Sequence, residues 1–221
     1  MSGVGLSLTR FSAKVTAFDT NFLKELNMQT QTKQLGIFAG LVVLMAFTRS
    51  SHFGSTIHLP DATLAIFLVA GFMLPRTTWA ALAAFAFLLL EAGGIDYYAI
   101  VYRNVSDYCV SPAYWFLIPT YATMWLGGRW FAAQQKSDWK GLALFAGVSW
   151  LTSSVAFLIS NGAFYLLSGR FTEMNVAEYA ARVAKYYTPY VSSSLMYLSL
   201  AAIIYIAVTQ LTKTSADTAQ S

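Results

Sequence analysis

The chain contains a single cysteine, Cys109, in a segment rich in tyrosines, acids and turn-forming residues. An odd cysteine cannot close an intramolecular disulfide, so it is either a small buried hydrophobe or a reactive thiol. Thiolates are soft ligands that suit soft or borderline transition metals. Asp96 lies 13 residues before this cysteine and Tyr114 lies five residues after it. The grouping predicts a site for a ligand that contains a metal.

Two other kinds of chemistry are compatible with these residue types. A bare metal ion bound by Cys109 with His52 and His58 is not favoured, because the histidine spacing is not a compact zinc spacing and no second cysteine is present. The chain has no Gly-x-Ser-x-Gly or His-Glu-x-x-His motif. The alternative hypothesis is a membrane-embedded, thiol-dependent enzyme. In that enzyme Cys109 would be the nucleophile, and Asp96 or a histidine would be the base.

Two further charged residues are candidates. Glu91 lies near the end of a hydrophobic segment, where a carboxylate is costly to bury and is a site candidate by default. The glycines at 93–94 that follow it predict a helix end or bend before Asp96. Arg182 follows Glu178 by four residues, so it forms either a solvated ion pair or a planar contact for a large ligand.

Tyrosines are concentrated in the same part of the chain. A belt at the membrane interface accounts for most of them. Their density around Cys109 exceeds what a belt requires, and phenols are suited to a large, flat ligand rimmed with hydrogen-bonding groups. The residues around Cys109 are Tyr97, Tyr98, Tyr102, Tyr108, Tyr114, Trp115 and Tyr121, and a second group contains Tyr179, Tyr186, Tyr187 and Tyr190.

The composition indicates the environment that these residues occupy. Of the 221 residues, 57% are hydrophobic and 11% are charged, whereas soluble domains carry about 25% charged residues. The chain is therefore expected to lie in a lipid bilayer. The net charge of +4 is spread along the chain, which excludes the basic stripe that a nucleic-acid partner requires.

Hydrophobic stretches predict an all-α membrane protein with six transmembrane helices. A helix needs about 20 apolar residues to cross a bilayer, and the first two stretches have only 13 each. We expect two spans joined by the loop 48–61, with a re-entrant hairpin as the alternative. The stretches are Leu35–Phe47, Ala62–Leu74, Thr78–Ile95, Ala113–Ala133, Gly141–Leu167 and Tyr187–Leu211.

This pattern predicts three parts. Residues 1–33 form a cytoplasmic amphipathic segment, because apolar residues recur there in steps of three and four from Leu8 to Leu26. Residues 34–211 form the six-helix domain, and residues 212–221 form a disordered cytoplasmic tail. Nine lysines and arginines fall in the inner segments and five in the outer ones, which places both termini in the cytoplasm. The acidic residues then gather outside, around a mouth that opens outward.

The six spans, the outward mouth, and the set Asp96, Cys109, Tyr114 and Arg182 resemble the BtuM family. These are small vitamin B12 uptake proteins related to the substrate-binding (S) subunits of energy-coupling-factor transporters. The resemblance covers residues 35–211, and its sharpest part is Asp107-Tyr-Cys-Val-Ser-Pro-Ala-Tyr. It implies an S-subunit-like six-helix bundle in the bacterial inner membrane, with a binding site that faces the periplasm.

The resemblance also implies residue roles. Cys109 would bind the cobalt of cobalamin and displace the vitamin's own base, while Asp96, Tyr114, Arg182 and His58 would contact the corrin periphery. A thiolate below cobalt weakens the bond to an upper ligand such as cyanide, so removal of that ligand can accompany binding. S-subunits often carry an Ala-x-x-x-Ala pair in the first span, where the coupling subunit docks. Gly36 and Gly40 stand there instead, and small residues of this kind allow close helix approach, either in internal packing or to a partner membrane protein.

Overall fold

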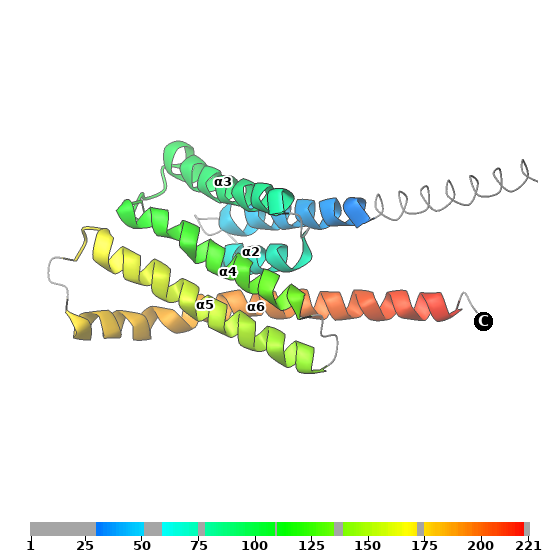
Figure 1. The fold of residues 1–221 in the computed structure, drawn as a ribbon. Coiled ribbons are helices and arrows are strands. Elements are labelled where there is room, and N and C mark those ends of the chain that lie inside the picture. Colours follow the sequence, from blue (N-terminus) through cyan, green and yellow to red (C-terminus); the bar gives the residue numbers. More distant parts are fainter. Residues whose placement is uncertain are drawn as a thin grey trace, which may run out of the picture. The chain divides into compact units, whose positions relative to one another are not determined.

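The computed structural model describes residues 30–50, 59–74, 78–108, 110–134, 139–171 and 175–218, with side chains up to Leu211. Every regular element in these ranges is helical, which confirms the expected all-α class for this part of the chain. The elements are the helix Thr30–Ser50, α2 (Thr63–Met73), α3 (Thr78–Arg103), the 3₁₀ helix η1 (Pro112–Phe116), α4 (Leu117–Ala133), α5 (Trp139–Leu167) and α6 (Val176–Thr218) (Figure 1).

Four helices in the described ranges are long and apolar enough to cross a membrane: Thr30–Ser50, α3, α5 and Val176–Leu211 of α6. Their large apolar side chains are mostly exposed, Leu90 at 76% and Ile203 at 64% being examples. Such outward-facing apolar surface fits lipid, where only the backbone groups must be paired internally. The chain is therefore an α-helical membrane protein. The count of six spans stays a prediction, because α2 has 11 residues and α4 has 17.

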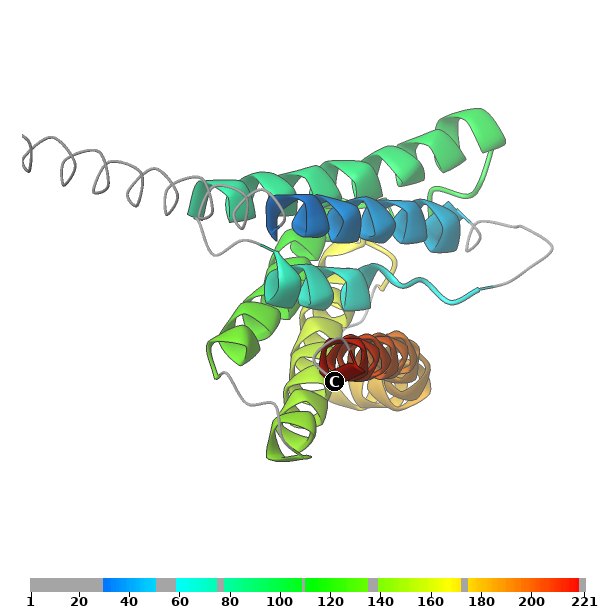
Figure 2. The same cartoon turned by 90° about the vertical axis from the view of Figure 1, so that its right-hand side faces the viewer.

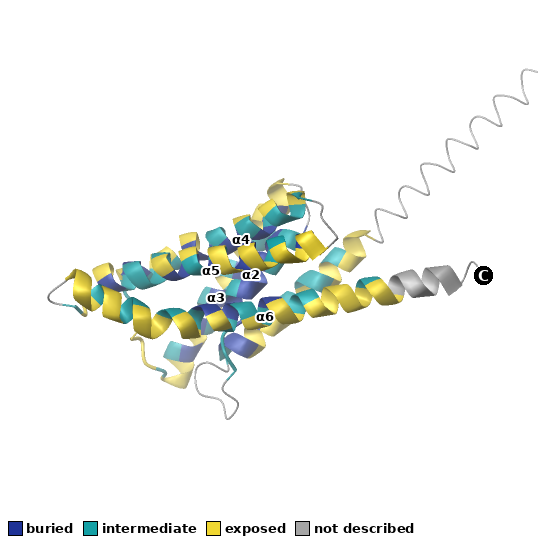
Figure 3. Cartoon of the chain, turned by 90° about the horizontal axis from the view of Figure 1, so that it is seen from below, coloured by how far each residue is buried: buried dark blue, intermediate teal, exposed yellow. Residues whose placement is uncertain are grey.

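The chain divides into two compact units, Met1–Gly40 and Leu41–Ser221. In the second unit, α2 is the most enclosed helix and contacts α3, α4 and α6. Its residues are mostly buried (Figure 3). Helix α4 also packs on α5, and α5 packs on α6, which Figure 2 views nearly along its axis. The core of this unit thus surrounds a short central helix.

Glycines bring α2 and α4 into backbone contact. A Cβ atom added at Gly128 would overlap the carbonyl oxygen of Leu68 and lie 2.9 Å from the backbone nitrogen of Phe72. A Cβ atom added at Gly71 would overlap the carbonyl oxygen of Trp125. Small residues permit such close approach between membrane helices. The two glycines therefore allow α4 to pack closely against the C-terminal half of α2.

Helix α3 departs from the sequence prediction. The expected helix end at residues 93–94 was wrong, since the helix continues through both glycines to Arg103. Glycine weakens a helix by about 1 kcal/mol, but a lipid-facing segment must satisfy its backbone groups internally. Asn104, the residue after the helix, has a φ of 52°. This left-handed conformation is typical of the residue that follows a helix.

The other helix bounds also differ from those expected. The helix described over Thr30–Ser50 has 21 residues, where the sequence predicted a hydrophobic stretch of 13. Helix α6 begins at Val176 rather than Tyr187, which places Glu178 and Arg182 on a helix instead of in a loop. At its other end α6 is helical to Thr218, where the sequence predicted a disordered tail from residue 212. The residues that extend these helices are more polar than the hydrophobic stretches, so hydropathy alone did not include them.

Candidate functional site

The predicted site residues are only partly among the described residues. Cys109 and His58 lie outside them. Asp96 lies on α3, Tyr114 on η1 and Arg182 on α6. The structure brings Asp96 and Tyr114 together, because the Tyr114 hydroxyl donates a hydrogen bond of 2.7 Å to Asp96 Oδ2.

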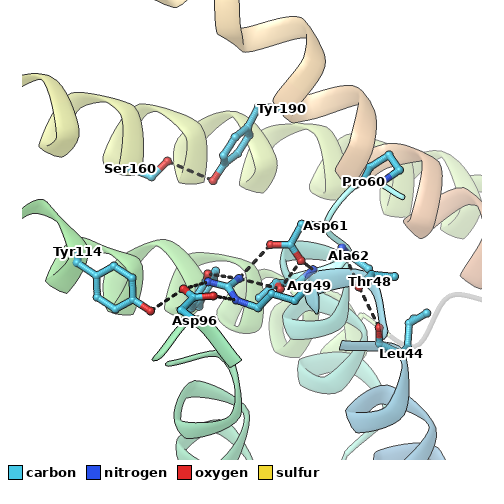
Figure 4. Close-up of polar contacts among 12 residues, drawn as sticks. Leu44, Thr48, Arg49, Pro60, Asp61, Ala62, Asp96, Tyr114, Ser160 and Tyr190 are labelled. Atoms are coloured by element: carbon cyan, nitrogen blue, oxygen red, sulfur yellow. Dashed lines mark hydrogen bonds and ion pairs between the residues drawn. The ribbon is translucent and has the colours of Figure 1, made fainter. Parts of the chain in front are cut away.

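Arg49, at the end of the first helix, is the centre of this group (Figure 4). Its Nε donates to Asp96 Oδ1 at 2.7 Å and its Nη2 donates to Asp96 Oδ2 at 2.6 Å. Its Nη1 donates to Asp61 Oδ2 at 3.0 Å, and also to Thr63 Oγ1 and Tyr121 Oη. A planar guanidinium suits this two-point contact with a carboxylate. We call Arg49, Asp61, Asp96 and Tyr114 the Arg49 cluster.

Local structure holds each partner in place. The first helix ends beside α2, where Thr48 Oγ1 accepts a hydrogen bond from the backbone nitrogen of Ala62. Asp61 accepts a hydrogen bond from the backbone nitrogen of Thr63 at 2.9 Å, as acidic residues commonly do where a helix begins. Tyr121 is buried, and its ring stacks on Phe67 of α2 with centroids 4.5 Å apart. Packing therefore fixes the cluster before any ligand is considered.

Burial and charge are unevenly distributed in the Arg49 cluster. The side chains of Arg49 and Asp96 are 8% and 9% exposed, whereas that of Asp61 is 32% exposed. Tyr114 is half-buried. One guanidinium faces two carboxylates, so the cluster carries a formal charge of −1. Its positive charge is enclosed, while a carboxylate and a phenol reach its surface.

The hydroxyl of Tyr114 is committed as a hydrogen-bond donor. It lies 2.7 Å from Asp96 Oδ2, and an ionised carboxylate can only accept. The free lone pairs of the Tyr114 oxygen can then only accept hydrogen bonds.

Arg182 occupies a different environment, among aromatic rings. Its guanidinium carbon lies 5.1 Å from the ring centre of Phe164, 5.0 Å from that of Phe171 and 4.9 Å from that of Tyr186. Among the described residues no ion pair joins Arg182 to Glu178, and Arg182 Nε is buried without a hydrogen-bond partner. Of the two readings of Arg182, the geometry fits a cation held against ring faces rather than a solvated ion pair.

The described residues on either side of Cys109 contact these two groups. Tyr108, the preceding residue, packs its ring 5.7 Å from that of Phe164, on which Arg182 also lies. The guanidinium of Arg170 lies 4.0 Å from the Tyr108 ring centre, and its Nε donates to the Tyr108 carbonyl oxygen at 3.2 Å. A few residues later the chain enters η1, where Tyr114 reaches Asp96. Tyr108, before Cys109, thus packs on a ring that Arg182 also contacts, and Tyr114, after Cys109, belongs to the Arg49 cluster.

Other polar groups near this region have no partner. Oε2 of Glu91 and Oγ of Ser111 are buried without a hydrogen bond among the described residues, as is Oδ1 of Asn161 on α5. Glu91 does not pair with Asp96, which is occupied by Arg49 and Tyr114. Unpaired buried polar atoms are costly, and these atoms are left out of the hydrogen-bond network of the Arg49 cluster.

Sequence reasoning did not select Arg49 and Asp61 as site residues, and it named Tyr121 only as one of the tyrosines around Cys109. A signal for Arg49 was present, because an arginine at the end of an apolar span is a default site candidate by the argument that selected Glu91. The pairing itself joins residues 47 positions apart and depends on helix packing that hydropathy does not encode.

A comparison with models of known protein families and with curated proteins finds no match to this chain.

Proposed function

We propose that this chain binds cobalamin and takes part in its uptake across a bacterial inner membrane. In this proposal six helices span the bilayer, both termini lie in the cytoplasm, and the site faces the periplasm. The fold would be that of the S-subunits of energy-coupling-factor transporters. A coupling module would dock on the face that carries Gly36 and Gly40, where small side chains permit close approach.

One observation carries the proposal. On each side of Cys109 in the sequence, a tyrosine contacts polar side chains that suit a large amide-rich ligand. Tyr108 contacts the ring under Arg182, and Tyr114 contacts Asp96. Arg182 Nε has no partner among the described residues and can donate to a ligand carbonyl. This arrangement supports contacts to the corrin periphery on two sides of the cysteine, and His58 is proposed as a further contact from the first loop.

The thiol supplies the chemistry in this proposal. The Cys109 thiolate would bind cobalt from below and displace the vitamin's own base, since thiolates are soft donors that suit transition metals. Electron donation from sulfur weakens the opposite cobalt–cyanide bond. Cyanide would leave with its electron pair and water would take the free position, so the oxidation state of cobalt does not change.

Absorption spectroscopy tests the proposal directly. The purified full-length chain in lipid nanodiscs should shift the visible bands of added cyanocobalamin, and Cys109→Ser should abolish the shift, because a hydroxyl is a poor ligand for cobalt. Ser111→Ala is the matched control, since it removes a small polar side chain from the same loop that has no partner among the described residues. An unperturbed spectrum with the native chain, or an equal shift with Cys109→Ser, would refute the role of the thiol.

A further inference from the structure

We propose that the Arg49 cluster selects ligands by side-chain charge, accepting carboxamides and rejecting carboxylates. The inference rests on the proposed function, because it takes Asp96 and Tyr114 to face the edge of a corrinoid. Arg49 and Asp61 have no role in the proposed function. Here they determine which side-chain groups at the edge of the corrinoid are accepted.

The first argument concerns hydrogen-bond direction. The donors of Arg49 point inward to Asp96, Asp61, Thr63 and Tyr121. The proton of Tyr114 is committed to Asp96. What remains at the surface of the cluster is acceptor capacity, on the half-buried phenol oxygen and on the Asp61 carboxylate, which is 32% exposed. An amide N–H can pair with these lone pairs, whereas an ionised carboxylate has no proton to donate.

The second argument concerns charge. With two carboxylates and one guanidinium, the cluster is formally −1, and its positive member is 8% exposed. A ligand carboxylate that approaches this surface meets like charge in a partly desolvated site. Coulomb repulsion between the ligand carboxylate and the cluster, together with the lost hydrogen bond, should weaken binding of the acid roughly 10- to 100-fold. A carboxamide of nearly the same size avoids both effects.

Arg49 acts here as a positioning residue. Its two-point contact orients the Asp96 carboxylate so that Oδ2 accepts the hydrogen bond from the Tyr114 hydroxyl. Its single charge also limits the net charge of the cluster to −1 rather than −2. Selectivity should therefore follow the cluster charge in a definite order. It should be highest after removal of the Arg49 charge and lowest after removal of the Asp61 charge.

The test compares two kinds of ligand on the same protein. The full-length chain in nanodiscs at pH 7.5 is titrated with cobalamin and with a set of its isomeric monocarboxylic acids, each having one side-chain amide hydrolysed. The measured quantity is the ratio of amide affinity to acid affinity. We expect a ratio of roughly 10 to 100 for at least one isomer. We expect a ratio about tenfold smaller for Asp61→Asn and a larger one for Arg49→Gln.

The ratio separates charge selection from a structural role, since a merely damaged site lowers both affinities alike. Asp61→Asn alone decides the question if Arg49→Gln does not fold, because the asparagine carbonyl can still accept from Thr63. Asp107→Asn, in the neighbouring exposed loop, is the matched control and should leave the ratio unchanged. Equal binding of amide and acid, or an unchanged ratio in Asp61→Asn, overturns this inference while cobalamin binding stands. No binding of cobalamin at all overturns the proposed function together with it.

Discussion

Replacing Gly128 with alanine tests whether backbone contact between α2 and α4 supports the fold. The added methyl group would overlap the carbonyl oxygen of Leu68 and lie 2.9 Å from the nitrogen of Phe72. Both obstacles are backbone atoms, so no side-chain rotation relieves the overlap. The two helices must instead separate by about 1 Å, because closely packed interiors have no free space to absorb the methyl group.

The expected cost follows from this geometry. Overpacking costs about 1–3 kcal/mol, and the upper end applies because the obstacle is main chain. Alanine in place of glycine stabilises a helix by about 1 kcal/mol. The net loss of unfolding free energy is therefore about 2 kcal/mol, which corresponds to a fall in Tm of roughly 4–8 °C for a chain of this size.

Thermal unfolding of the detergent-purified chain measures the effect, with two neighbouring substitutions as controls. Gly147→Ala on α5 meets no atom within 4 Å, so it should raise Tm by a few degrees through helix propensity, by about 2–4 °C at most. Gly127→Ala meets only side-chain atoms of Thr152, which can shift, so its effect should be smaller than that of Gly128→Ala. A Tm for Gly128→Ala equal to or above that of Gly147→Ala would show that the α2–α4 contact is looser than described.

Two further predictions concern polar contacts between helices. Arg49→Met leaves the Asp96 carboxylate buried without its cation and should lower the free energy of unfolding by about 3–5 kcal/mol. Arg103→Met, at an exposed position, should change it by less than about 1 kcal/mol. Similar Tm values for the two variants would contradict the buried pair. Ser153 and Ser194 share a hydrogen bond of 2.9 Å between α5 and α6, so a double-mutant cycle to alanine should give a coupling energy of about 0.6 kcal/mol, and additive effects would argue against the bond.

The sequence was sufficient to predict the helical class and the membrane environment, because both depend on composition and on runs of apolar residues. It was not sufficient for the helix ends. Gly93 and Gly94 weaken a helix locally, yet α3 continues through them, since the requirement for paired backbone groups outweighs intrinsic propensity. Similarly, Glu178 and Arg182 are too polar to count as part of a span, although α6 includes both.

The candidate site was predictable in its residue types and not in its pairing. Asp96, Tyr114 and Arg182 were selected from the sequence, but the contact between Asp96 and Tyr114 requires α3 and η1 to meet. Arg49 pairs with Asp96 across 47 positions, and no local pattern specifies that distance. Charged residues at the ends of apolar spans are therefore best considered as one group, because they pair with one another.

The length of α6 has a consequence for its surroundings. Its apolar section, Val176–Leu211, has 36 residues and so measures about 54 Å, against about 30 Å for the hydrocarbon layer. Glu178, Arg182 and Lys185 all lie in its first ten residues, and charged side chains are costly in hydrocarbon. A helix of this length fits the hydrocarbon layer only in part, so we expect the section that carries these three residues to be the part outside it.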